Sequence, residues 1–311
     1  MFTLAAASAL AVLGGPVATE VVLPSQPAPL HGTLLTPPDA SAVAVILPGS
    51  GPTDRDGNSP LGVAASTYRL LAEGLAEQGV ATLRIDKRGL AASAAAGPAE
   101  ADLRFDAYAA DARAWAAEAA TRAGKPCAWL IGHSEGALVA VKAVQGGDDK
   151  VCGLILLSGA GRPAGVVLRE QLASLPEPTK TQAFAALTEL EAGRTVADPP
   201  PALAALLRPS VQPYLISWLP LDPAALIAAY DGPVLIGQGT TDLQVSVTDA
   251  QALAGADPRA TLKLWDGVNH LLKTAPADRA ANMATYADPT LPLAPGVAAD
   301  VGAFIRANER R

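Results

Sequence analysis

The chain has 311 residues, of which half are hydrophobic, and its formal net charge is −7 with three histidines and two cysteines. This length and apolar content allow one large α/β domain or two small ones, and they exclude a globally disordered chain. No basic stretch offers a footprint for phosphate groups, so the composition argues against a nucleic-acid-binding protein. Two cysteines are too few for a disulfide scaffold or a zinc cluster.

The first 18 residues, MFTLAAASALAVLGGPVA, are apolar and rich in small residues, but they are too short to span a bilayer. They are similar to the hydrophobic core and cleavage end of a signal peptide, with Ala18 as the last residue, although the usual positive charge is missing. We therefore expect a periplasmic or secreted protein, with a cytoplasmic one as the alternative. No later stretch is long and apolar enough for stable membrane insertion.

Beyond residue 18 the apolar patterns of strands and helices alternate, and Tyr68, Leu71 and Leu75 mark one face of the first helix. Alternation of this kind predicts an α/β fold with a parallel sheet and right-handed crossovers. A terminal amphipathic helix is expected around Val297 and Val301. The runs that predict strands are Thr19–Leu23, Leu30–Thr36, Val43–Leu47, Ala81–Ile85, Cys127–Ile131, Val151–Leu157, Val234–Ile236 and Ala260–Trp265.

The alternation stops between about Gly161 and Tyr230, where a leucine- and alanine-rich helical pattern is interrupted by prolines. We interpret residues 161–230 as a helical cap inserted into a core formed by residues 19–160 and 231–311. Loops and insertions at the carboxyl ends of strands are where α/β sheets bind ligands. Tyr214 and Trp218 are therefore candidates for lining a substrate pocket, although ordinary packing within the cap is the simpler explanation.

The most informative stretch is Gly132-His133-Ser134-Glu135-Gly136, which follows an apolar run and precedes a small-residue helical pattern. This is a G-x-S-x-G pentapeptide between a strand and a helix, the context of a nucleophile elbow rather than of a chance match. The two glycines lack a Cβ, which lets strand and helix pack closely around the turn. The backbone amide of Glu135, at the first turn of the helix, would point to a developing oxyanion.

Three polar residues, Ser134, Asp242 and His270, each follow a predicted strand. Strand ends on one side of a parallel sheet share an edge, so these residues can converge. Their order, Ser–Asp–His, is that of α/β-hydrolases. His270 would take the Ser134 proton, and Asp242 would fix the imidazole tautomer. Asp242 could instead cap a helix and His270 could be a surface residue, while Asp231 and Asp266 are rivals for the acid with poorer placement.

The loop that follows Val43–Leu47 should supply the second oxyanion donor. We expect the backbone N–H of Ser50, with that of Gly51 as the alternative. Charged residues of this loop are expected to hold it through ion pairs with charges that follow the next strand, although solvated loop charges are an equally good explanation. The residues concerned are Asp54, Arg55 and Asp56 on the loop, and Asp86, Lys87 and Arg88 after the strand.

Together these motifs resemble serine α/β-hydrolases, and specifically a bacterial esterase group with a GSGPTDRDGN loop. The resemblance extends from about residue 30 to the C-terminus and implies an eight-stranded, mostly parallel sheet with a helical cap, no metal and no cofactor, and a small-molecule ester substrate. Pro48 replaces the histidine of the HG pair found in many such enzymes, so no role is carried over for that histidine. The matching segments are Gly49–Asn58, Asp86–Gly89 (DKRG), Gly132–Leu138 (GHSEGAL), Asp222-Pro223, Gly239–Val245 (GTTDLQV) and Asn269–Lys273 (NHLLK).

The function expected from these features is that of a carboxylesterase-type serine hydrolase (EC 3.1.1.-) that acts through an acyl-enzyme. A peptidase or a thioesterase could use the same triad, and the sequence does not separate them. A non-catalytic binding protein on this fold is a further alternative, but such proteins usually lose a triad member. A Rossmann protein is disfavoured, because the third glycine of G-x-G-x-x-G is missing after Gly49-Ser50-Gly51.

In the fold that the resemblance implies, Cys127 and Cys152 begin two adjacent parallel strands. Two starts in similar register could bring the cysteines to the Cα separation of roughly 5.5–6 Å that a disulfide needs. A periplasmic location would permit the bond. Two buried free thiols are an equally good expectation, and the sequence leaves this choice open, as it does the oligomeric state.

Overall fold

The structure is a computed structural model that describes residues 14–147 and 149–309. The leader expected over residues 1–18 lies largely outside these residues. The first strand, β1 (Val17–Leu23), includes the last two residues of that segment, and it pairs with β2 (Leu30–Thr36) in an antiparallel register.

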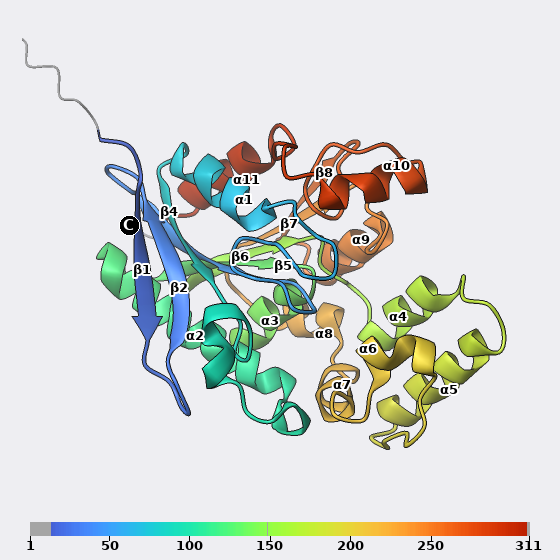
Figure 1. The fold of residues 1–311 in the computed structure, drawn as a ribbon. Helices are drawn as coiled ribbons and strands as arrows, with labels where there is room; N and C mark the ends of the chain where they lie inside the picture. The colour runs from blue at the N-terminus through green and yellow to red at the C-terminus, as the bar shows by residue number, and fades with distance from the viewer. Residues whose placement is uncertain (1–13, 148, 310–311) are drawn as a thin grey trace, which may run out of the picture.

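An eight-stranded sheet forms the centre of the molecule, in the order β1-β2-β4-β3-β5-β6-β7-β8 (Figure 1). The pairs β1–β2 and β2–β4 are antiparallel, and every other neighbouring pair is parallel. This confirms the eight-stranded, mostly parallel sheet that the resemblance to α/β-hydrolases implies. The remaining strands are β3 (Ala42–Leu47), β4 (Val80–Ile85), β5 (Ala128–His133), β6 (Val151–Leu157), β7 (Val234–Gly239) and β8 (Thr261–Trp265).

Helices cover both faces of the sheet, which is why every residue of β3 to β7 is buried. One face packs against α1 (Thr67–Ala76) and α11 (Val297–Ala307). The other packs against α2 (Phe105–Ala123), α3 (Glu135–Ala143) and α9 (Val247–Ala256). Short 3₁₀ segments occupy Ala91–Ala96, Glu100–Asp102, Pro201–Leu203 and Thr285–Ala287, and α10 spans Arg279–Ala284.

The chain between β6 and β7 is entirely helical in its regular structure. Figure 1 shows α4 to α7 gathered beside the sheet, whereas α8 lies close to α3 and α9. Among the described residues, no helix combines the length and the apolar character needed to cross a membrane. The helices of this segment are α4 (Ala164–Leu172), α5 (Thr179–Glu191), α6 (Ala204–Leu207), α7 (Gln212–Trp218) and α8 (Pro223–Ala228).

A disulfide joins Cys127, which immediately precedes β5, to Cys152 in β6, with a Cα–Cα distance of 5.2 Å. The structure thereby decides between the two alternatives that the sequence left open. The bond crosslinks two neighbouring central strands near their amino ends, away from the edge where their carboxyl ends lie. Closing a loop with a sequence separation of 25 is worth about 3.5 kcal/mol in the chain-entropy treatment.

Candidate active site

Ser134 stands on a tight turn between β5 and α3. Its backbone angles, φ 55° and ψ −121°, lie in a region that residues with a side chain rarely adopt, so the turn is strained. A Cβ on Gly132 would lie 2.1 Å from the Gly136 carbonyl oxygen, and one on Gly136 would lie 2.3 Å from that of Leu47. Only glycine fits at these two positions, which is the reason that the sequence pattern suggested for them.

Asp242 and His270 meet at the same edge of the sheet, just beyond β7 and β8. Asp242 Oδ2 lies 2.8 Å from His270 Nδ1, and Oδ1 accepts hydrogen bonds from the amides of Gln244 (2.8 Å) and Val245 (3.0 Å). Burial acts to raise the pKa of this carboxyl, but His270 and the two amides lower it more, so its net pKa lies below the ordinary value. The carboxylate thus fixes the imidazole through Nδ1 and leaves Nε2 available for chemistry.

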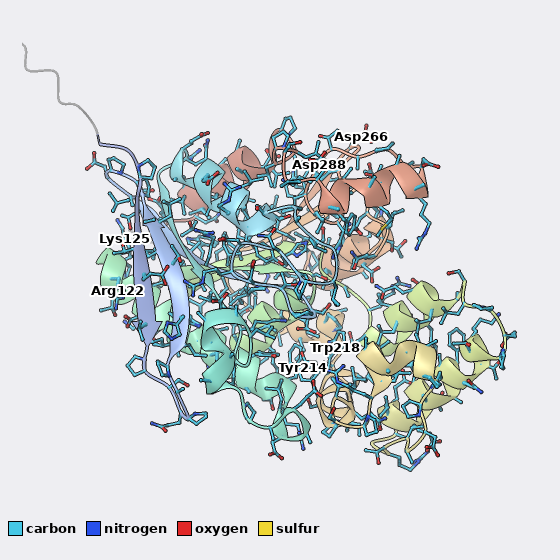
Figure 2. All side chains as sticks on the ribbon, in the orientation of Figure 1. Arg122, Lys125, Tyr214, Trp218, Asp266 and Asp288 are labelled. Atoms are coloured by element: carbon cyan, nitrogen blue, oxygen red, sulfur yellow. A yellow bond between two sulfur atoms is a disulfide. The ribbon has the colours of Figure 1, made fainter. Side chains whose placement is uncertain are left out.

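The two rival aspartates have other partners. Asp231 pairs with Arg259 at 2.8 Å, and its side chain is almost fully exposed. Asp266 accepts a hydrogen bond from the Thr240 hydroxyl at 3.1 Å (Figure 2). Neither carboxylate contacts His270, so Asp242 is the acid that this arrangement offers.

A buried hydrogen-bond network holds His270 beside the elbow. The carbonyl oxygen of His270 lies 2.7 Å from Nε2 of His133, and Nδ1 of His133 lies 2.9 Å from the Tyr68 hydroxyl. A carbonyl can only accept, so Nε2 of His133 carries the proton and Nδ1 accepts from Tyr68. Burial, with a contribution from the neighbouring His270, lowers the pKa of His133 to about 3 and keeps it neutral.

Ser134 directly follows His133 in the chain, so this network links the backbone of His270 to the residue that precedes the nucleophile candidate. Within the described residues, no hydrogen bond joins the Ser134 hydroxyl to the His270 ring. Such bonds are often long in proteins without substrate and shorten in the reacting complex. The sequence pattern did not identify the network, because His133 is a variable position of the pentapeptide and Tyr68 was assigned only to a helix face.

The loop after β3 lies against Ser134. A Cβ on Gly49 would lie 3.1 Å from Ser134 Cβ, and Ser50, Ser134 and Glu135 line one cavity with a volume of ≈ 90 Å³. The Ser50 N–H donates to no other group among the described residues. The Glu135 N–H begins α3 and has no partner within that helix. Two residues whose backbone N–H groups have no partner among the described residues therefore line the cavity beside Ser134.

Ion pairs of Arg55 and Asp56 hold this loop, as one of the two sequence expectations proposed, whereas the Asp54 carboxylate accepts hydrogen bonds from amides of the loop itself. Arg55 donates to Asp86 from Nε (2.9 Å), Nη2 (2.7 Å) and its backbone N–H (2.9 Å). Asp56 pairs with Arg84 of β4. Arg88, the third basic candidate, pairs instead with an aspartate on α2.

Helices α4 and α7 provide much of the opposite wall of the cavity. Val167 and Leu168 of α4 and Trp218 of α7 line it, together with the polar side chains of Gln171 and Gln244. Tyr214 was also expected there. It does not line this cavity, because its ring packs behind it, 6.1 Å from Phe105, 5.8 Å from Tyr108 and 6.2 Å from Trp218 between ring centroids (Figure 2).

Among the described residues, no group of three or more histidine, cysteine, aspartate or glutamate side chains is arranged to hold a metal ion. The side chains and amides of the site itself offer three kinds of reactive group. These are a hydroxyl on a strained turn, an imidazole oriented by a carboxylate, and two amides beside the hydroxyl.

Residues 61–189 match the family model described as serine aminopeptidase, S33, which covers less than half of the chain. No curated protein matches the chain. Est1E from Butyrivibrio proteoclasticus, solved with ferulic acid bound, is 18% identical with a TM-score of 0.60 over 93% of this chain and 98% of that protein.

Two further solved structures have a similar fold. An esterase of Pyrococcus furiosus, Pf2001, is 17% identical with a TM-score of 0.59 over 94% of this chain and 91% of its own. The esterase domain of a Rhodothermus marinus protein is 20% identical with a TM-score of 0.56 over 94% and 99%. At such identities the likeness concerns the fold, and the chain has the α/β-hydrolase fold.

Proposed function

We propose that this protein is a serine hydrolase that cleaves carboxylic esters through an acyl-enzyme, with Ser134 as the nucleophile. His270 Nε2 removes the serine proton during attack and returns it to the leaving alcohol. Asp242 holds the imidazole and stabilises its charged form. Water then attacks the acyl-enzyme with the same histidine as its base, and the acid is released.

One observation carries this proposal: Asp242 and His270, in contact at 2.8 Å, and a serine on a strained turn all follow strands of the same parallel part of the sheet, at its carboxyl edge. An aspartate–histidine pair also occurs at structural sites, and a strained serine also occurs in turns without catalysis. Their juxtaposition, linked by the bond from His133 to the His270 carbonyl, has a direct use in nucleophilic catalysis.

The backbone amides of Ser50 and Glu135 would form the oxyanion hole. They lie on different elements but line one cavity with Ser134. Two donors aimed at the developing negative charge are each worth about 2.7–4 kcal/mol of barrier. We propose further that residues 161–230 act as a cap over this cavity and that its apolar wall receives the acyl group of a small or medium ester.

A serine aminopeptidase is the second candidate, because the family model that matches residues 61–189 has that description. Such an enzyme must bind the ammonium group at the substrate N-terminus, which calls for an available carboxylate. Among the described residues that line the cavity, Glu135 carries the only carboxylate, and it already lies 3.5 Å from Lys87. This arrangement favours a neutral ester substrate.

The disulfide supports our proposal that the protein works in the periplasm or outside the cell. Disulfides form and persist in oxidising compartments and are rare in the cytoplasm of mesophiles. Joining Cys127 to Cys152 would serve a protein in such a compartment.

Hydrolysis of p-nitrophenyl acetate, butyrate and octanoate tests the function, with leucine p-nitroanilide as the peptidase substrate. We expect ester hydrolysis that the Ser134→Ala variant loses by roughly 10⁴–10⁶-fold in kcat while its circular dichroism spectrum is unchanged. Ser41→Ala, an exposed serine before β3 at the far end from the site, is the control and should retain full activity. Equal activity in Ser134→Ala and wild type would remove Ser134 as the nucleophile, and a preference for the anilide would favour the peptidase.

A further inference from the structure

Lys87 is a buried lysine immediately beyond β4, and the mechanism above does not use it. Only 6% of its side chain is exposed. Its Nζ lies 2.6 Å from the Gly49 carbonyl oxygen, 3.5 Å from Glu135 Oε1 and 5.4 Å from the centre of the Tyr108 ring. Removing an ammonium group from water is costly unless new partners replace the water. The partners of Lys87 must therefore stabilise its buried charge.

The shorter of the two polar contacts identifies the main partner of Lys87. A charge-assisted hydrogen bond is short, and the bond to the Gly49 carbonyl is much shorter than the contact with Glu135. That carbonyl belongs to the same planar peptide as the Ser50 N–H. In a trans peptide the C=O and N–H point in opposite directions, so holding the oxygen turns the Ser50 N–H away from Lys87.

Gly49 is also held from its other side. Its own N–H donates to the Tyr68 hydroxyl at 2.9 Å, and the residue is buried in contact with Ser134. With the N–H and C=O of Gly49 both bonded to buried side chains, the following peptide has little rotational freedom. Ser50, by contrast, is exposed and lines the cavity beside Ser134.

Glu135 completes the arrangement from the helix side. Its backbone N–H, at the start of α3, is the second proposed oxyanion donor, and its carboxylate is the counter-ion of Lys87. Only 5% of the Glu135 side chain is exposed, so the pair is screened little by water. Lys87 therefore bridges the two segments that supply the two amides, through its hydrogen bond to the Gly49 carbonyl and its ion pair with Glu135.

We propose that Lys87 is a positioning residue for the oxyanion hole: it orients the Gly49–Ser50 peptide, and its pairing with Glu135 sets the distance between the two donor amides. This inference rests on the serine-hydrolase function proposed above. Without Lys87 the Ser50 amide is free to rotate, and one of the two oxyanion donors is lost. An ammonium ion on the carbonyl also polarises that peptide and strengthens its N–H as a donor.

The test separates this role from a merely structural one through the Lys87→Met variant and the Lys87→Met/Glu135→Gln double variant. Lys87→Met leaves a buried carboxylate without its partner and should lower both the melting temperature and kcat. The double variant removes that charge, so its melting temperature should return towards wild type. We expect its kcat for p-nitrophenyl butyrate to stay about 10²–10³-fold below wild type, with KM within about twofold, because one donor is still missing.

Lys142→Met is the matched control, since Lys142 of α3 also lies 3.5 Å from a carboxylate, that of Asp106. It should leave kcat unchanged. Recovery of kcat together with stability in the double variant would overturn the proposal. A wild type without ester hydrolysis would count against the proposed function instead. The crystal structure of the double variant then decides on Lys87: a rotated Gly49–Ser50 peptide supports its role, and an unchanged peptide overturns it.

Discussion

The two walls of the cavity beside Ser134 are built by different physical means. On the core wall, directional bonds between buried polar groups fix the positions of Asp242, His270 and Gly49. On the cap wall, α4 and α7 present mainly apolar contacts, and the buried Trp218 Nε1 forms no hydrogen bond. Directional bonds specify one geometry, whereas apolar packing tolerates changes of shape. We therefore expect reactivity to depend on the core wall and substrate choice to depend on the cap wall.

Among changes to the core wall, we expect Asp242→Asn to cause a large loss of activity. An asparagine amide at this position can donate to Nδ1 and so favours the wrong imidazole tautomer, and we expect kcat for p-nitrophenyl butyrate to fall about 10⁴-fold. The preference between acetate and octanoate should stay unchanged, since the cap wall is intact. Asp266→Asn is the control and should be close to wild type. A loss below tenfold, or an equal loss in the control, would contradict the role of Asp242.

The features that the sequence could predict are those that depend on local backbone geometry. The strands β3 to β7 were predictable because continuous burial leaves continuous apolar runs, and the turn at Ser134 was predictable because only glycine fits at Gly132 and Gly136. Asp242 and His270 were found because parallel strands end at a common edge. These features follow from backbone geometry, which a short stretch of sequence reports directly.

The sequence did not predict the links between these segments. The bonds of His133 to Tyr68 and His270, and of Lys87 to Gly49, join residues 38 to 137 positions apart. Which side chains meet across such separations depends on the packing of whole elements, and no local pattern reports it. The position of Tyr214 behind the cavity rather than in it has the same cause, because the ring contacts of α7 with α2 decide it.

Protonation of His133, which belongs to the core wall, should lower the stability of the folded protein. The pKa of His133 is lowered to about 3 in the folded protein, against 6.5 in the unfolded chain, so unfolding takes up a proton between these values. Stability should therefore fall as the pH drops below about 6.5, with a slope approaching ~1.4 kcal/mol per pH unit from this one group. Urea unfolding of wild type and His133→Gln between pH 7 and 4 measures the difference.

In the His133→Gln variant, the His133 contribution to the slope of unfolding free energy against pH should be absent, whatever the stability of the variant at pH 7. His31→Gln is the matched control, since His31 lies half-buried in β2 and its ring has no place in the network around Ser134. It should retain the wild-type slope. Equal slopes in wild type and His133→Gln would show that His133 is not the group that takes up the proton.

The smallest of these effects should come from the cap wall. Trp218→Ala removes an indole that lines the cavity and enlarges the space for an acyl chain. We expect kcat for the acetate ester to stay within about threefold and the octanoate-to-acetate ratio of kcat/KM to rise about tenfold, because apolar pockets discriminate chain length by about 1–3 kcal/mol. Tyr214→Phe, on the same helix but outside the cavity lining, should leave that ratio unchanged. If Trp218→Ala instead lowered kcat for every ester by the same large factor, the cap wall would share in the reaction itself, and the division between reactivity and selectivity would fail.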